Sequence, residues 1–168
     1  MPNLYSNNND GYIYSGTEVN WADARDDTSG TVSTGGTVAS SFTAVGKFAS
    51  RGGGSTYRLV RSFMYFDTSG ITGVVSAATI KIRGYVYKDG SVIAVKSDAF
   101  GGDGGTALAS TDFNNIVGYS TGSSLAGNAT DYSNTITGGS WSTSGYNDLT
   151  GTSDLRADMQ NNNVVIIC

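Results

Sequence analysis

The sequence predicts an all-β protein, because three of its features favour strands over helices. Short runs in which apolar and polar residues alternate recur along the 168 residues, and such runs are typical of half-buried strands. Helical periodicity is nearly absent. Gly, Ser, Thr and Asn make up 78 of the 168 residues and gather between the alternating runs, where turns are needed. We therefore expect an antiparallel β-sandwich, with a jelly roll as the first form and an immunoglobulin-like sandwich as the second.

Six segments carry the strand signal. They are residues 12–14, 42–49, 57–67, 78–88, 91–97 and 164–168. The alternation is cleanest in the fourth segment, where Ile80 and Ile82 would face the core while Lys81 faces solvent. The pair Asp89 and Gly90 suits a two-residue hairpin turn. We therefore expect 91–97 to return as the partner strand of 78–88.

The two ends of the chain differ in character. Residues 1–9 are polar and rich in Asn, which predicts an N-terminal arm, followed by a single sandwich domain over residues 10–168. The last segment, Val-Val-Ile-Ile-Cys, is continuously apolar and suits a central buried strand. Ending on such a run indicates either that the natural sequence continues or that Cys168 inserts into a neighbouring surface.

Helical signals are limited to one or two short turns. Residues 153–160 would begin at a cap on Ser153 or Asp154, with Leu155 and Met159 one turn apart on the same face. A second turn is expected at residues 110–116, with Phe113 on its apolar side. The polar stretches between these elements, at 28–41, 101–106, 118–127 and 138–145, would form the loops.

Composition excludes several classes of function. The chain has no His and a single Cys, which rules out a Ser-His-Asp or Cys-His nucleophile, a His-ligated zinc site and an internal disulfide framework. Glu18 is the single Glu, and nothing predicts an Asp buried with a raised pKa, so we expect no enzymatic activity. The apolar runs are too short to predict insertion into a membrane.

Charge is sparse and acidic. The net charge is −4 and the pI is near 4.5, which argues against nucleic acid as a partner. The densest basic stretch is spread along alternating strands, so its side chains are expected on solvated faces; it comprises Arg51, Arg58, Arg61, Lys81, Arg83 and Lys88. An uncharged polar surface of this kind is typical of secreted, cell-surface and virion β-proteins.

The N-terminus does not match that extracellular character. It has neither a basic region nor an apolar stretch, so no signal peptide is expected. A virion protein would resolve the mismatch, because it is made in the host cytoplasm and functions on the particle surface. A chain that has lost its signal peptide would also resolve it, and would be extracellular.

Three segments together resemble DNRLRE-type domains, which are also classed among carbohydrate-binding modules. Residues 10–16, Asp-Gly-Tyr-Ile-Tyr-Ser-Gly, are similar to the opening strand of that family. Residues 61–71 resemble its next marker, an Arg followed by an apolar strand that ends in Phe-Asp, and residues 75–82 resemble its Ala-x-Leu-x-Leu strand. The resemblance covers residues 10–98 and implies a jelly-roll sandwich. Such domains occur in secreted polysaccharide-binding proteins, and similar sequences occur in the virions of tailed phages.

Three aromatic residues are candidates for binding a glycan. Trp141 and Tyr146 lie in a stretch of Gly and Ser, and Trp21 follows Asn20. Aromatic rings among small residues suit stacking against sugars, since a ring combines a flat apolar face with a polar edge. The alternative is that each Trp packs under a long loop as a local plug.

Aspartates cluster at two places. Asp23, Asp26 and Asp27 form one group, and Asp98 and Asp103 form another beside pairs of Gly. Oxygen ligands on bent loops suit a structural Ca²⁺ ion. The alternative is that these residues are ordinary turn-forming aspartates. We expect no metal site and no cofactor.

The leading hypothesis is a non-enzymatic structural protein on the virion surface of a tailed phage, either a capsid decoration or a fibre or tail appendage, with capacity to bind glycans. Its partners would be other virion proteins, further copies of itself, with a trimer expected by analogy, and a host surface glycan. The second hypothesis is a carbohydrate-binding module or adhesin of a secreted or cell-surface protein. A third is a filament subunit that exchanges the strand at 164–168 with its neighbour.

Overall fold

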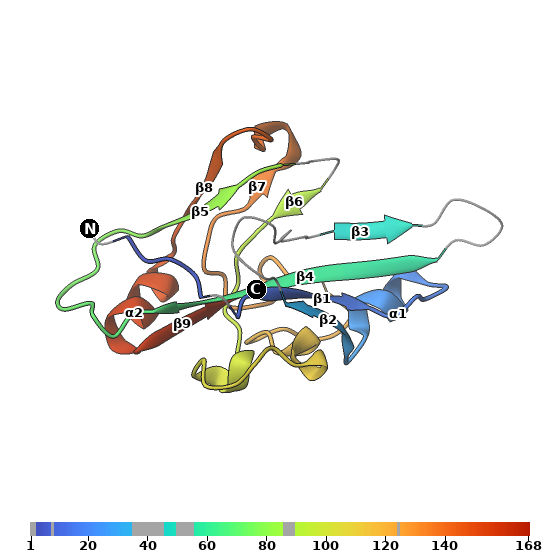
Figure 1. Ribbon diagram of the computed structural model, residues 1–168. Helices are drawn as coiled ribbons and strands as arrows, with labels where there is room; N and C mark the ends of the chain where they lie inside the picture. Colours follow the sequence, from blue (N-terminus) through green and yellow to red (C-terminus); the bar gives the residue numbers. More distant parts are fainter. Residues whose placement is uncertain (1–2, 8, 35–45, 50–55, 86–89, 124) are drawn as a thin grey trace.

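The protein is mostly antiparallel sheet with few and short helices, as an all-β chain should be (Figure 1). The computed structural model describes residues 3–7, 9–34, 46–49, 56–85, 90–123 and 125–168. Its strands are β1 (Gly11–Ser15), β2 (Gly30–Thr34), β3 (Gly46–Ala49), β4 (Tyr57–Asp67), β5 (Thr79–Arg83), β6 (Ser91–Val92), β7 (Ile136–Thr137), β8 (Tyr146–Thr150) and β9 (Val164–Ile167). Its helices are α1 (Trp21–Asp26), α2 (Ser153–Asn161) and the 3₁₀ turns η1 (Phe100–Gly102), η2 (Ser110–Asn114) and η3 (Gly138–Ser140).

Strand β4 is the longest strand and the centre of the main sheet. Its 11 residues are rich in aromatic and branched side chains, which favour extended backbone. Its first part pairs with β1 and β3, and its last part pairs with β9, all antiparallel. Since β1 also pairs with β2, the order is β2-β1-β4-β3 with β9 added beside β4. The predicted bounds 57–67 are confirmed, while of the predicted strand 42–49 only 46–49 lies within the described residues.

Strand β9 is hydrogen-bonded on both edges, which confirms the prediction of a central buried strand. One edge pairs with β4. On the other edge the backbone N–H of Val95 donates to the Cys168 carbonyl at 3.0 Å, and the N–H of Cys168 donates to the Val95 carbonyl at 2.9 Å. Cys168 also packs against the chain's own core, and burial raises the pKa of its thiol to about 12.

The apolar side chains form two cores, and alternate residues of the same strands supply both. Ile166 belongs to the first core and its neighbours Val165 and Ile167 to the second. Side chains alternate between the two faces of a strand, so the cores lie on opposite faces of the sheet at β4 and β9. The first core is closed by the segments around η1 and η2, which carry Phe100 and Phe113.

The second core lies between the main sheet and two small sheets. Strand β5 pairs with β8, and β6 pairs with β7; Figure 1 shows both pairs on one side of β4, with η1 and η2 on the other side. The predicted pairing of 91–97 with residues 79–83 is wrong, because β5 has β8 as its partner and 95–97 bridge to residues 131, 167 and 116. Residues 86–89, which would form the rest of the predicted hairpin and its turn, lie outside the described residues. The predicted alternation holds, since Ile80 and Ile82 pack on the second core while Lys81 and Arg83 are exposed.

The helices agree with the expectation only in part. Helix α2 forms where it was predicted, but its N-cap is Thr152, whose Oγ1 accepts a hydrogen bond from the Leu155 N–H at 3.3 Å. The turn predicted at 110–116 is η2, with Phe113 fully buried. Helix α1 and strand β2 occupy sequence without an apolar period. Strand β2 corrects the predicted loop 28–41 at residues 30–34, while residues 35–41 lie outside the described residues.

Arg61 corrects the prediction that the basic residues are solvated. Its side chain, on β4, is buried and only 3% of the residue is exposed. Its Nη1 donates to the Phe113 carbonyl at 2.6 Å and also to Asn114 Oδ1, and its Nη2 donates to the Arg25 carbonyl at 3.1 Å. The guanidinium carbon lies 4.3 Å from the centroid of the Phe113 ring. Arg61 therefore joins β4 to α1 and η2.

Replacing Arg61 by Lys should destabilise the fold strongly. A single ammonium keeps the charge but cannot reach three acceptors in three directions, so buried carbonyls lose their donors. We expect a loss of about 2–4 kcal/mol in the free energy of unfolding, measured by urea denaturation. Arg58→Lys is the control, because Arg58 is an exposed residue on the same strand; an equal loss in both variants would contradict the role given to Arg61.

The N-terminal segment is tied to β4 through Asp10. The Asn7 N–H donates to the Tyr65 carbonyl and the Tyr65 N–H donates to Asp10 Oδ1, both at 3.2 Å. The carboxylate thus takes the place of a backbone acceptor beside β4. Burial raises the pKa of Asp10 to about 6, although hydrogen bonds from Ser6, Tyr65 and Asn7 oppose the shift.

The raised pKa of Asp10 predicts a pH dependence of stability. A carboxyl group whose pKa is higher in the folded than in the unfolded state stabilises the fold when protonated, so stability falls as the pH rises from about 4 to 6. Asp10→Asn keeps the acceptor for the Tyr65 N–H and removes the charge. We expect this variant to match the parent near pH 4 and to exceed it by about 1–2 kcal/mol at pH 7, measured by thermal unfolding. If the stability of the two proteins changed with pH in the same way, the role given to the Asp10 carboxyl group would be contradicted.

Candidate functional site

A surface hollow lies beside the segment that runs from β7 through η3 to β8. Its volume is about 340 Å³. We call this site the β7–β8 hollow. Most of its lining side chains carry a hydroxyl or amide group. The lining residues are Asn134, Thr135, Ile136, Thr137, Ser140, Ser142, Tyr146, Asn147 and Asp148. Such a lining offers both donors and acceptors of hydrogen bonds at close spacing.

An exposed aromatic ring stands at the rim of the hollow. Tyr146 is the first residue of β8 and 63% of it is exposed. It lies opposite Arg83 in the register of β5 and β8, and the Arg83 guanidinium carbon is 6.0 Å from the centroid of its ring. This cation–π contact orients the ring while leaving it accessible.

Asp148 supplies the carboxylate of the hollow. It lies two residues beyond Tyr146 and so on the same face of β8. Lys81 of β5 pairs with it, with Nζ 3.2 Å from Oδ2. Both side chains are more than half exposed, so the pair contributes little to stability. The ion pair orders the rim of the hollow and offsets the negative charge of Asp148, which is the one carboxylate among the described lining residues.

Asn147 holds the loop of the hollow in place from beneath. It points inward from β8 and is 4% exposed. Its Oδ1 accepts from the Ser142 N–H at 2.7 Å, and its Nδ2 donates to the carbonyls of Ser142 at 3.0 Å and Ile82 at 3.3 Å. A buried amide that satisfies the backbone of both a loop and a strand fixes one relative to the other.

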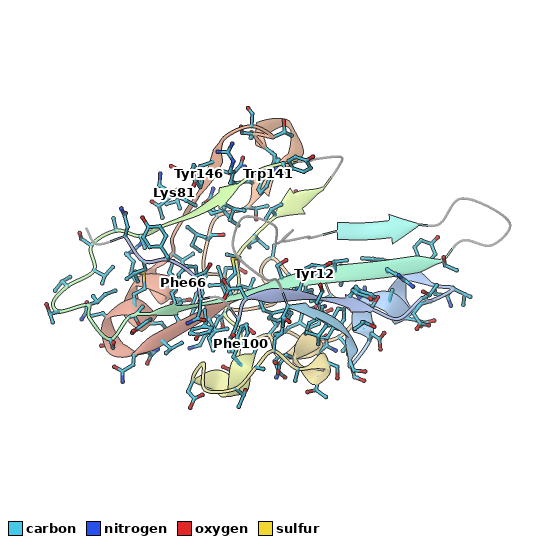
Figure 2. The ribbon with its side chains drawn as sticks, viewed as in Figure 1. Tyr12, Phe66, Lys81, Phe100, Trp141 and Tyr146 are labelled. Carbon is cyan, nitrogen blue, oxygen red and sulfur yellow. The ribbon has the colours of Figure 1, made fainter. Side chains whose placement is uncertain are left out.

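The structure brings two of the three candidate aromatic residues together. Figure 2 shows Trp141 and Tyr146 near one another at the end of β5 and β8. Trp141 is partly buried and packs beside Gly84, in the manner of a loop plug, whereas Tyr146 is open to solvent. Trp21 begins α1 and is partly buried, and Figure 1 shows α1 far from β8.

Four of the five aspartates in the two acidic clusters, all except Asp98, accept hydrogen bonds from nearby described groups. Asp26 Oδ2 is 2.6 Å from Arg25 Nη2, and hydrogen bonding to that guanidinium holds the pKa of Asp26 at about 2. Asp27 accepts from the Gly16 N–H at 2.9 Å, and Asp103 from the Gly105 N–H at 2.8 Å. Within the described part of the chain, no three His, Cys, Asp or Glu side chains gather as a metal site would require.

Sequence reasoning named Tyr146 as a candidate, although it placed the residue in a loop and not on a strand, and it named no other residue of the hollow. Asn134, Asn147 and Asp148 looked like ordinary polar residues near a loop, because nothing in their spacing marks the pairing of β5 with β8. The inward position of Asn147 also broke the alternation that would have identified β8 as a strand.

Comparisons of the chain with models of protein families, with curated proteins and with solved structures gave no match. None of the helices in the described residues is both long and apolar enough to cross a membrane.

Gly84→Ala should disrupt the β7–β8 hollow. A Cβ at this buried position would lie 1.8 Å from the Ser142 carbonyl oxygen and 2.8 Å from Trp141 Nε1. The loop that carries Trp141 would have to move, at a cost of about 1–3 kcal/mol. We expect lower thermal stability and altered tryptophan fluorescence.

Gly139→Ala is the matched control for that substitution. Gly139 lies in η3, beside the same hollow, and a Cβ added to it would have open space around it, so the unfolding and fluorescence of this variant should stay close to those of the parent. Equal behaviour of the two variants would contradict the tight packing at Gly84.

Proposed function

We propose that the chain is a non-enzymatic, surface-displayed module that binds glycans in the β7–β8 hollow. The observation that carries the proposal is the Tyr146 ring, 63% exposed, beside closely spaced hydroxyl, amide and carboxylate groups. An apolar ring face packs on the C–H face of a sugar, while the polar groups pair with its hydroxyls.

A binding role suits this hollow better than hydrolysis. Glycoside hydrolysis requires two carboxyl groups on either side of the scissile bond. Of the described residues that line the hollow, Asp148 alone has a carboxyl group, and it is paired with Lys81.

We further propose that the architecture is an antiparallel β-sandwich of the jelly-roll type. The support is the second core, which lies between the main sheet at β4 and β9 and the small sheets β5–β8 and β6–β7. Two sheets that share an apolar layer are the defining arrangement of a sandwich. The resemblance of residues 10–98 to DNRLRE-type domains favours the same architecture.

The proposed setting is the virion surface of a tailed phage, as a capsid decoration or a fibre or tail appendage. The uncharged polar surface and the resemblance to phage virion sequences support it. The alternative setting is a carbohydrate-binding module or adhesin of a secreted or cell-surface protein, which would use the same hollow. A role for 164–168 in strand exchange is disfavoured by one observation, because β9 is already paired on both edges within the chain.

Tyr146→Ala should abolish or strongly weaken glycan binding. Loss of one stacking ring costs about 1–2 kcal/mol, or roughly tenfold in the dissociation constant. A glycan array followed by titration of the best ligand would measure this. Tyr5→Ala is the control, because Tyr5 is 83% exposed and does not line the hollow; unchanged binding by the Tyr146 variant would exclude this ring.

The virion setting has its own test. The native protein should be found by mass spectrometry in purified phage particles, and in solution it should form a homo-oligomer, with a trimer expected by analogy. Light scattering after size-exclusion chromatography gives the oligomeric state. A monomer at high concentration that is absent from particles would favour the secreted module instead.

A further inference from the structure

A second and larger hollow lies where α2 ends, and we call it the α2 hollow. Its volume is about 560 Å³. It is bounded on one side by residues 96–103 and on the other by the Asn161–163 run that ends α2 and leads into β9. It shares no lining residue with the β7–β8 hollow, and Figure 1 shows the end of α2 well away from η3.

The donors of the α2 hollow are held in place by one carboxylate behind it. Asp158 of α2 accepts from Lys96 Nζ at 2.9 Å, from Asn162 Nδ2 at 2.9 Å and from the Tyr132 hydroxyl. Burial alone would raise the pKa of Asp158, but the hydrogen bonds from Tyr132 and Lys96 hold it below its ordinary value. The carboxylate is therefore ionised near neutral pH and keeps Lys96 in a fixed position.

Tyr132 forms a rigid part of the wall. It is 1% exposed, and burial together with the neighbouring Asp158 raises its pKa above the ordinary value. It therefore stays protonated as a donor to Asp158. A lining that is fixed before a ligand arrives loses less conformational entropy when the ligand binds.

The acceptors of the hollow come from the opposite wall. Asp98 is exposed, and its backbone is anchored by donation of its N–H to the Asn115 carbonyl at 3.1 Å. No hydrogen bond within the described residues uses its carboxylate. Asp103 also lines the hollow, and its Oδ1 accepts from the Gly105 N–H. Asn161 and Asn163 add amides that both donate and accept.

The chemistry of this lining selects one class of ligand. The formal charge of Lys96, Asp98 and Asp103 sums to −1, which disfavours anions. Val164 and Ile166 are the only apolar side chains among the described lining residues, which disfavours apolar ligands. Carboxylates that accept, an ammonium that donates and amides that do both match the hydroxyl groups of a polyol.

We propose that the α2 hollow is a second saccharide site, so that one chain holds two sugars at separate places. The inference uses the ligand class of the proposed function but rests on different residues. Two sites on one protein chain can bind the same polysaccharide, or two neighbouring glycans on a surface, at the same time. The resulting avidity gives tight binding even where each site alone is weak.

The test is a titration followed by nuclear magnetic resonance. Lactose, cellobiose, maltose and diacetylchitobiose are added in turn to the labelled full chain at millimolar concentration, and the backbone amide shifts are followed. We expect at least one sugar to shift the amides of residues 97–103 and 161–164 as well as those of the β7–β8 hollow. Asp98→Ala should weaken binding at the α2 hollow about fivefold or more, since a hydrogen bond to a charged group is lost, and leave the β7–β8 shifts unchanged.

The controls separate this inference from the proposed function. Tyr146→Ala should remove the shifts of the β7–β8 hollow alone, and Asp23→Asn, on α1 and outside both hollows, should change neither set. Asp103→Asn replaces Asp98→Ala if the latter does not give the dispersed spectrum of a folded protein.

Each outcome then decides one of the two proposals. Shifts confined to residues 134–148 would overturn the second site and keep the proposed function. Shifts confined to the α2 hollow would do the reverse, and an absence of shifts with all four sugars would overturn both.

Discussion

The burial of the Arg61 guanidinium is the constraint on which much of the structure depends. A buried charge is costly unless it is hydrogen-bonded. The two terminal nitrogens of Arg61 donate to the carbonyls of Arg25 and Phe113 and to the side chain of Asn114, while its buried Nε has no hydrogen-bond partner among the described residues. These acceptors come from sequence regions more than 30 residues away from β4. The fold therefore brings α1 and η2 onto β4 as one unit, since removal of either would leave the cation unsatisfied.

The position of Arg61 on β4 also fixes which face of the main sheet each segment covers. Arg61 and Phe63 are two residues apart, so they share a face, and Phe63 belongs to the first core. The same face therefore holds η2 and closes that core. The opposite face is left for Met64 and Phe66, which pack against the second core with Leu149 of β8. Because Leu149 faces this core, the alternate residues Tyr146 and Asp148 of β8 face solvent.

The sequence predicted those parts of the fold that local alternation specifies. Strand β4 and strand β9 have continuous apolar or alternating patterns, and helix α2 has an apolar pair one turn apart, so all three were found. Strand β8 was missed because its inward residues are Asn147 and Leu149, and a polar residue at an inward position removes the alternation. The burial of Arg61 was missed for a related reason. Its partners at residues 25 and 113 are distant in sequence, so the residues next to Arg61 give no sign of them.

In the candidate site, too, local sequence features were predictable and distant partners were not. An exposed Tyr in a polar stretch can be recognised from sequence, so Tyr146 was found. The partners that give it a setting come from β5 and from the carbonyls of distant loops, and the turn residues 89 and 90 favoured a different pairing for β5. The register of β5 with β8 is what places Arg83 against the ring.

Buried polar side chains explain how a chain so rich in Gly, Ser, Thr and Asn holds long loops in fixed positions. Asn147 bonds the backbone of the 142 loop, Thr68 donates to the carbonyl of Asn162 at 2.6 Å, and Asp112 accepts from the N–H groups of Phe100 and Ala109. Each is less than 7% exposed, and each satisfies backbone groups that lack a strand or helix partner. Loops fixed in this way need few apolar residues beneath them, so their outer faces are free to carry the polar groups of the two hollows. The composition that weakens helices and strands in this chain therefore also supplies the buried side chains that fix the described loops.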